Sequence, residues 1–408
     1  MTELKKALTL VDLVFLILTN VVGAGVFVIL TKSLAFGGRH SILAFVFVVA
    51  LLSIISGLTY VEISHHYASN VAEYMSIRDV FGEHAATLSS ALIYFFAIFS
   101  SATIIIALSK TIYKDSLLLS VFFIALMGVI NFFGIDVSKA ISNSIGAGMV
   151  TMFLLLIYFG REHISFKAIN KMPDKGANGF LLCSLVALFL YNGYDVVVKM
   201  HDEIKDVNDI PNAMFISLAI ITFFYVMLLA INQSIFSMKE LGTLYTPLYD
   251  LFHLFTGPFG YSVSYAAGTM IMFTTAFVSL LSGTRFMYGM AKENKLPAVF
   301  AELSPYSTPH WAIAVSCALV FLLVLTKSET FALILANLCG LLMLIAVNIA
   351  LIVIRYKEKE QNADHYHMPL YYNRLPMLPL LPIAGFSVLL GYAVYLMLFD
   401  RALLRKIM

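Results

Sequence analysis

Long apolar stretches, separated by short polar segments, occupy most of the 408 residues of this chain. An α-helix needs about 20 consecutive apolar residues to cross the hydrocarbon core of a bilayer. Because backbone polar groups find no water there, each crossing segment must be a helix or a strand of a closed barrel. Charged residues make up 12% of the chain, about half of their share in soluble domains. We therefore expect an all-α, multi-pass integral membrane protein.

The apolar stretches predict about eleven transmembrane helices in one transmembrane domain, 1–408. The segments between them are too short for a separate soluble domain. The Lys and Arg residues of the connecting segments favour a cytoplasmic N-terminus. We expect the protein in the plasma or cell membrane. The predicted helices cover about residues 9–31, 41–63, 85–109, 116–134, 138–160, 179–199, 212–237, 261–284, 310–326, 330–354 and 377–399.

Two of these helices carry signals for an interruption at bilayer depth. The first contains NVVGAGVFVIL (20–30), with two glycines that each cost about 1 kcal/mol of helix propensity relative to alanine. The sixth contains the turn dipeptide Asn192–Gly193, followed by the acidic Asp195. A lone Gly-x-Gly in a membrane helix is commonly a close-packing position. The matching places of the two signals instead predict a pair of discontinuous helices, which is typical of transporters with inverted repeats.

The interrupted helices divide the chain into two sets of five. Repeat one covers about 9–160, repeat two covers about 179–354, and the helix at about 377–399 is additional. An unwound segment frees backbone N–H and C=O groups that a polar substrate can satisfy. The free N–H groups at a helix N-terminus suit a carboxylate, and free carbonyls suit an ammonium group. Such a site fits an α-amino acid that is moved by alternating access.

Four sequence stretches resemble a known family. They are NVVGAGVFV (20–28), FLYNGYD (189–195), DEIKDVNDIPNAM (202–214) and SGTRFMYGMAKENKLPAVF (282–300), with a weaker match in YVEIS and AEYMSIRDVFG (60–82). Their order and spacing are similar to those of the amino acid–polyamine–organocation (APC) superfamily of permeases. The resemblance implies the LeuT-like fold, a 5+5 inverted repeat with discontinuous helices 1 and 6.

The resemblance also implies a substrate site at the two breaks. Backbone amides around Ala24 would hold the substrate carboxylate, carbonyls around Leu190 would hold its amine, and the ring of Phe189 would close over it. The hydroxyls of Thr274 and Thr275 form a candidate ion site for Na⁺. No metal and no cofactor is expected. The substrate-binding residues are Val22, Gly23, Ala24, Gly25, Val26, Phe189, Leu190, Asn192, Gly193 and Asp195.

The sequence departs from the family pattern in two ways. Many members carry a lysine in the middle of the fifth span, and that position falls at about Met149 here. Proton coupling through such a lysine is therefore in doubt. The twelfth span that is usual in the family is missing, which we expect to affect oligomer contacts more than transport.

Other polar residues receive more ordinary interpretations. We expect Glu62, at the end of the second span, to be solvated. We expect Arg285 to pair with Glu203 or Asp202. Asp195 is expected to pair with a backbone group or a cation across the bundle, or to touch the substrate amine.

These observations favour a secondary active transporter, a permease or exchanger, for neutral amino acids, because the third, eighth and tenth spans carry no interior acid or base. Basic amino acids or polyamines, another small organic solute, and an inactive family member are the alternatives. Coupling to H⁺ or Na⁺ is left open, as are an antiporter or symporter mode and the oligomeric state. An enzyme or a channel would need reactive clusters or charged rings that the spans lack. A net charge of +2 without a basic stretch argues against a nucleic-acid partner.

Overall fold

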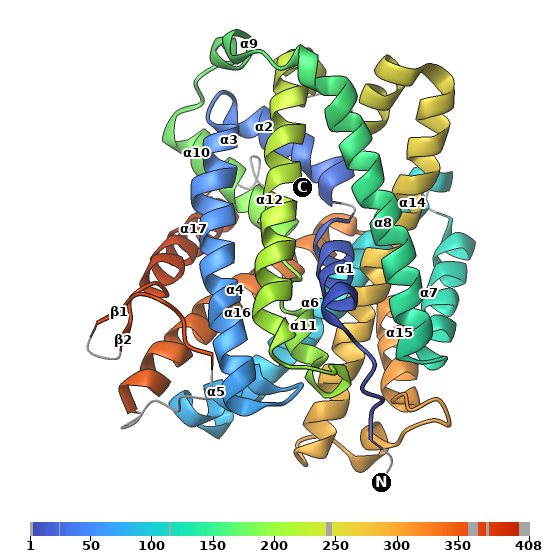
Figure 1. The fold of residues 1–408 in the computed structure, drawn as a ribbon, viewed down its shortest axis with the longest axis vertical. Helices are drawn as coiled ribbons and strands as arrows, with labels where there is room; N and C mark the ends of the chain where they lie inside the picture. Colours follow the sequence, from blue (N-terminus) through green and yellow to red (C-terminus); the bar gives the residue numbers. More distant parts are fainter. Residues whose placement is uncertain are drawn as a thin grey trace.

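The computed structural model describes residues 3–23, 25–113, 116–241, 247–357, 366–372 and 375–399 as an almost entirely helical bundle (Figure 1). Each predicted span overlaps one apolar helix of this bundle. Seven helices are long and apolar enough to cross a membrane: Ser41–Tyr67, Glu83–Tyr113, Ile135–His163, Gly176–Lys199, Asp209–Ile235, Pro247–Lys292 and Phe331–Lys357. Shorter apolar helices are Leu10–Val21, Leu117–Phe132, His310–Val324 and Leu380–Leu396.

The elements follow in chain order. They are α1 (Leu10–Val21), η1 (Gly25–Ile29), α2 (Leu30–Gly37), α3 (Ser41–Leu43), η2 (Ala44–Ala50), α4 (Leu51–Tyr67), α5 (Ala72–Phe81), α6 (Glu83–Tyr113), α7 (Leu117–Phe132), α8 (Ile135–Gly160), η3 (Arg161–His163), α9 (Phe166–Lys171), α10 (Gly176–Leu188), η4 (Phe189–Tyr191), α11 (Val196–Lys199), η5 (His201–Glu203), α12 (Asp209–Ile235), α13 (Met238–Leu241), α14 (Pro247–Lys292), η6 (Ala298–Ala301), α15 (His310–Val324), α16 (Glu329–Lys357), β1 (Tyr371–Tyr372), β2 (Leu375–Pro376) and α17 (Leu380–Phe399).

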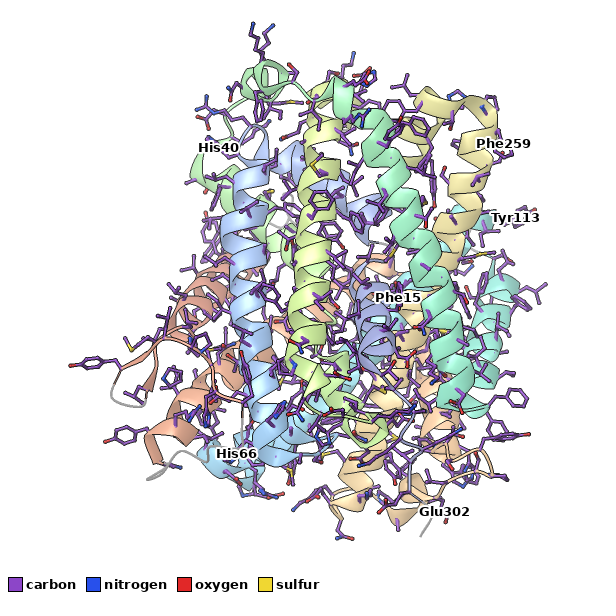
Figure 2. All side chains as sticks on the ribbon, viewed as in Figure 1. Phe15, His40, His66, Tyr113, Phe259 and Glu302 are labelled. Carbon is purple, nitrogen blue, oxygen red and sulfur yellow. The ribbon has the colours of Figure 1, made fainter. Side chains whose placement is uncertain are left out.

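The bundle is arranged around α1, which packs against α8, α11, α12 and α14 (Figure 1). Helix α6 packs against α14 and α16, and α17 lies at the edge against α16 and α4. Polar residues mark the two ends. His40 lies at one end, His66 and Glu302 lie at the other, and Phe15 lies between them (Figure 2). The arrangement places the end of α1 in the middle of the molecule.

Both predicted interruptions are present. Helix α1 ends at Val21, Val22 is extended (ψ 92°), and the chain resumes as a π-helix at Gly25. Helix α10 ends at Leu188 and passes through one 3₁₀ turn before the short helix α11 begins at Val196. Between them Gly193 has φ 111°, a left-handed value that residues with a Cβ adopt at a steric cost. The two interrupted regions meet, because η1 contacts η4 and α1 contacts α11.

The connecting segments hold more structure than the apolar pattern predicts. Residues 72–81 form helix α5, which packs against α4, α6 and α16. The predicted span at 261–284 is part of a much longer helical stretch, α14, which bends at Gly257 (φ 69°). Apolar pattern alone misses these parts because α5 lies at the end of the bundle, where a helix does not need a continuous apolar sequence.

The prediction that Glu62 is solvated is wrong. Its side chain is 4% exposed at the end of α4. Its Oε1 accepts a hydrogen bond from Nε of Arg355 on α16, and its Oε2 accepts one from the N–H of Met368 at 2.7 Å. The carboxylate is buried because an arginine from a distant helix and a loop amide converge on it. Glu62 therefore ties the segment before β1 to two helices.

The N-terminal segment closes the same end of the bundle. The N–H groups of Ala7 and Leu8 both donate to the carbonyl of Glu203, at 2.9 and 3.0 Å, and the N–H of Lys205 donates to the carbonyl of Leu8 at 3.0 Å. The side chain of Glu203 accepts two hydrogen bonds from the fully buried Arg285, at 3.2 and 3.1 Å. The predicted pairing of Arg285 with Glu203 is thus confirmed.

Candidate functional site

The two interruptions touch each other through a glycine. A Cβ added to Gly25 would lie 2.5 Å from Cδ2 of Leu190 and 3.7 Å from Cδ1 of Phe189. Only a residue without a side chain allows η1 and η4 to approach each other this closely. Val22 and Val26 on either side are buried, and the N–H of Val26 donates to the carbonyl of Gly23 at 3.2 Å.

Ala24, the residue between the two glycines, lies outside the described residues. The predicted carboxylate site is therefore described only by the residues on each side of it.

Gly23 lies against Thr275 of α14, whose side chain occupies the position that a Cβ at Gly23 would need. Three carbonyl oxygens surround the Thr275 hydroxyl, those of Thr19 at 2.6 Å, Val22 at 3.3 Å and Ile271 at 3.1 Å. Two of them belong to the end of α1, so the hydroxyl links α14 to the first break. The neighbouring Thr274 differs, because it donates to Met270 of its own helix at 2.9 Å.

Asn20 holds the two breaks together, and the sequence analysis missed it. Its Nδ2 donates to the carbonyl of Gly193 at 2.6 Å, and its Oδ1 accepts from Oγ of Ser279 at 2.9 Å. One buried side chain therefore joins α1, the second break and α14. The sequence did contain a signal for Asn20, which is an amide side chain inside an apolar span. Such a buried polar group is nearly always hydrogen-bonded to another part of the protein.

One of the carbonyls expected to hold the substrate amine already accepts a hydrogen bond within the protein. The carbonyl of Leu190 accepts from the hydroxyl of Tyr225 at 3.0 Å. A carbonyl oxygen has two lone pairs, so this oxygen keeps one for another donor. Asn192 is extended (ψ 146°), which ends the 3₁₀ turn and directs the chain away from helix.

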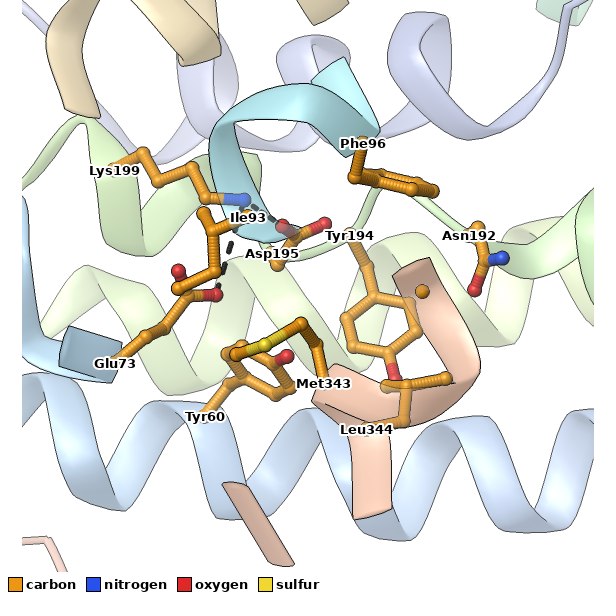
Figure 3. Close-up of a pocket in the computed structure, with 12 residues that line it drawn as sticks. Tyr60, Glu73, Ile93, Phe96, Asn192, Tyr194, Asp195, Lys199, Met343 and Leu344 are labelled. Atoms are coloured by element: carbon orange, nitrogen blue, oxygen red, sulfur yellow. Dashed lines mark hydrogen bonds and ion pairs between the residues drawn. The ribbon is translucent and has the colours of Figure 1, made fainter. Parts of the chain in front are cut away.

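A small cavity of about 20 Å³, enough for one water molecule, opens beside the second break (Figure 3). Three of the predicted site residues line it, namely Asn192, Gly193 and Asp195, whereas those of the first break do not. Apolar side chains from α6 and α16 form much of the remaining wall. The full lining is Tyr60, Glu73, Ile93, Phe96, Asn192, Gly193, Tyr194, Asp195, Lys199, Gly340, Met343 and Leu344.

Asp195 pairs with a cation of its own segment instead of one across the bundle. Its Oδ2 contacts Nζ of Lys199, one helical turn further on, and that Nζ lies 3.8 Å from Oε1 of Glu73 on α5. Lys199 is 2% exposed and Glu73 is 1% exposed. Figure 3 shows Lys199 between the two carboxylates. The sequence signal for Lys199 was its spacing of four residues from Asp195, which places both on one helix face.

Three polar atoms at this cavity have no hydrogen-bond partner among the residues that the structure describes. They are Nδ2 of Asn192, Oε2 of Glu73 and the hydroxyl of Tyr194. Burying a polar atom without a partner costs about 1–3 kcal/mol. Atoms of this kind beside a cavity indicate a place for a polar ligand, water or a proton.

Met149 lies on α8 and is buried in the bundle, 1% exposed. It carries an apolar thioether at the position where the resemblance leads us to expect a lysine in many family members. Buried charge near the breaks is instead supplied by Asp195, Lys199 and Glu73.

Known proteins resemble this chain over nearly its whole length. Residues 8–404 match the family described as amino acid permease. The methylthioribose transporter of Bacillus subtilis (strain 168) is 24% identical over 96% of this chain and 88% of its own length. The serine/threonine exchanger SteT of the same organism is 25% identical over 95% and 91%. The large neutral amino acids transporter small subunit 2 of Homo sapiens is 24% identical over 88% and 71%.

The family match covers far more than half of the chain, and it agrees with the helical bundle and the paired interruptions. Members of this family are membrane transporters and not enzymes. The chain therefore belongs to the amino acid permease family.

Proposed function

We propose that this chain moves neutral amino acids across a cell membrane by alternating access. The observation that carries the choice of substrate is the contact between Asp195 and Lys199 at the cavity. Asp195 directly follows the second break, and its charge is already balanced by Lys199. A cationic substrate would have to displace that ammonium group, whereas a neutral amino acid would not.

The proposal includes a topology. Eleven membrane-crossing helices would form a LeuT-like bundle, with repeat one at about 9–160, repeat two at about 179–354, and α17 outside both. The helices α1 and α10 would be the interrupted members of their repeats. The N-terminus would face the cytoplasm, as the Lys and Arg distribution favours, and α5 would do so too because it lies at the same end of the bundle (Figure 1).

The proposed binding pose uses the two breaks together. Backbone amides of residues 23–26 would receive the substrate carboxylate, and the carbonyls of Phe189, Leu190 and Asn192 would receive its ammonium group. The contact of Gly25 with Leu190 supports this pose, because it leaves the backbone of both breaks within reach of one small molecule. The side chain of the substrate would extend toward the cavity beside Asn192 and Asp195.

A sodium site at Thr275 is a second candidate for coupling. The specific observation is that three carbonyl oxygens converge on one hydroxyl, because oxygen ligands of this kind suit hard cations. Thr274 would have to turn its hydroxyl away from Met270 to join them. A dependence of uptake on a Na⁺ gradient would support this site.

Transport into proteoliposomes tests the proposed function. Labelled serine, threonine, leucine, lysine and methylthioribose would be offered to vesicles that are empty or preloaded with unlabelled amino acid, each with and without a pH or Na⁺ gradient. We expect uptake of neutral amino acids and little uptake of lysine. Preferential uptake of lysine, or of methylthioribose alone, would contradict the proposed substrate class.

A further inference from the structure

The charged groups at the cavity do not balance. Asp195 and Glu73 are acids, Lys199 is the one base that faces them, and all three are held among apolar walls from α6 and α16. The other titratable groups that face Glu73 are Tyr60 of α4 and Tyr194, both neutral phenols packed edge to face at 5.9 Å. With both acids ionised, the cluster would carry one uncompensated negative charge inside the protein, which is strongly unfavourable.

The two acids are not equivalent. The carboxylate of Asp195 is in direct contact with Nζ of Lys199. Glu73 has one oxygen 3.8 Å from that Nζ, beyond hydrogen-bond distance, and its other oxygen has no partner within the described part of the chain. Burial raises the pKa of Glu73 to about 7, with the negative charge of Asp195 acting in the same direction and Lys199 against it. Glu73 is therefore the member of the cluster that takes up a proton.

The cluster joins the short helix after the second break to α5. Asp195 directly precedes α11, Lys199 ends it, and Glu73 lies on α5. With Glu73 neutral, Lys199 is balanced by Asp195 alone. With Glu73 ionised, Lys199 is shared between two carboxylates and draws α11 toward α5. The charge on Glu73 thus biases the position of the short helix that follows the substrate carbonyls.

We propose that Glu73 carries the proton that crosses the membrane together with the amino acid. This inference rests on the proposed function and names its coupling ion. The proton moves from water on one side to the carboxylate of Glu73, stays there while the substrate is bound, and leaves to water on the other side. No covalent bond other than the O–H bond forms or breaks.

Proteoliposomes with an internal pH-sensitive dye test this proposal with the full-length protein. For the wild type we expect an inward proton gradient to drive at least fivefold accumulation of a neutral amino acid in empty vesicles, with matching acidification. Glu73→Gln should lose both, but should still exchange internal for external amino acid, because exchange needs no net proton movement. Asp79→Asn, on the same helix and largely exposed, is the matched control and should behave like the wild type.

The outcomes separate this inference from the proposed function. Exchange by the wild type without any proton-driven accumulation overturns the role of Glu73 and leaves the proposed function standing. Accumulation by Glu73→Gln at the wild-type level would also overturn the inference, because another group would then carry the proton. If the wild type neither exchanges nor accumulates any amino acid, the proposed function itself is contradicted.

A second measurement uses the wild-type protein alone and does not depend on how the variant folds. A hydrophobic carbodiimide reacts with protonated buried carboxyl groups, and mass spectrometry locates the modified residue. We expect modification at Glu73 that decreases as the pH rises from 6 to 8 and that substrate suppresses. Modification confined to other acids would overturn the inference.

Discussion

At the residue scale, charge inside the described part of the bundle is organised as ion pairs. Arg285 pairs with Glu203 and Arg355 with Glu62 across distant elements, whereas Lys199 pairs with Asp195 within one segment. Buried pairs of this kind contribute little net stability compared with apolar packing, but removing one partner is costly. Glu73 is a second acid next to the Lys199–Asp195 pair. Its negative charge would have no cation of its own, so its protonation responds to pH.

The first prediction concerns stability against pH. Because Glu73 has a pKa of about 7 in the folded protein, above its ordinary value near 4.5, the folded state binds its proton more tightly than the unfolded state does. This contribution is fully present at low pH and is lost as pH rises from about 4.5 through 7, by roughly 3 kcal/mol. Glu73→Gln should flatten this dependence. Thermal unfolding in detergent at pH 5.5 and 8.0 measures it, and an unchanged pH dependence would contradict the assignment.

The second prediction concerns Asp195 and Lys199. Lys199→Met and Asp195→Asn each leave a buried group without its partner, so each should lower the free energy of unfolding by about 3–5 kcal/mol. The double variant should cost less than the sum, because it removes both charges together. A double-mutant cycle of unfolding free energies measures the difference. Additive effects would mean that the two side chains do not stabilise each other.

Part of this residue-scale arrangement could be predicted from the sequence. Glu203 was one of the two acids expected to pair with Arg285, and the break at Gly193 followed from turn chemistry. The contact of Glu73 with Lys199 could not, because the partners are far apart in the chain and only packing brings α5 against the bundle. Glu62 was misjudged for the same reason, since its partner Arg355 comes from a distant helix.

At the scale of elements, the two interruptions are the feature that the glycines of residues 20–30 and the Asn192–Gly193 dipeptide predict and the structure contains. A helix that stops at bilayer depth has to have its free backbone groups satisfied locally. Here Asn20 does so for the carbonyl of Gly193 and Thr275 for that of Thr19, and we propose the η1–η4 contact as the place where a substrate binds. The exact ends of the helices, and the helix α5 between spans, depend on tertiary contacts that no periodicity encodes.

The third prediction tests this contact. Gly25→Val would place a branched side chain where Cδ2 of Leu190 lies at 2.5 Å from the added Cβ, so η1 and η4 would separate. We expect substrate affinity to fall at least tenfold while the protein remains folded in detergent. Gly148→Val on α8, where an added Cβ meets nothing within 4 Å, is the matched control. The ligand-dependent shift in melting temperature measures the substrate affinity of both variants. Full affinity in Gly25→Val would contradict the proposed binding pose.

The fourth prediction concerns the N-terminal segment. Leu8→Pro removes the N–H that donates to Glu203, and should loosen the closure over α11. We expect faster hydrogen exchange in residues 196–205. Lys6→Pro introduces the same ring at an exposed position and removes none of the three backbone hydrogen bonds that join this segment to residues 203–205. Equal exchange rates in the two variants would show that the segment does not hold this end closed.

At the scale of the whole molecule, the described structure is closed at the end that carries the N-terminus. The backbone bonds of residues 7–8 and the Arg285–Glu203 pair both lie on that side of the breaks. In the proposed alternating-access cycle these contacts would open once per cycle. Lys199 lines the cavity beside the second break and lies four residues before Glu203, so the charge of its cluster would act close to both.

Two neighbouring helices are short for the environment in which we place them. Helices α7 and α15 have 16 and 15 residues and contact each other, which makes them roughly 24 and 22 Å long. A typical hydrocarbon core is about 30 Å thick. Phe132, Phe133 and Tyr306 pack together at one end of this pair and fix its depth.

Lipid around α7 and α15 must therefore thin to meet them, at a modest cost for each ångström of mismatch. The fifth prediction is that reconstitution into bilayers of progressively longer acyl chains will slow transport without unfolding the protein. Uptake rates in vesicles of 14-, 16-, 18- and 20-carbon lipids would measure this. A rate independent of chain length would mean that these two helices do not meet the acyl chains directly. The thickness of the host membrane thereby becomes a determinant of where in a cell this permease works best.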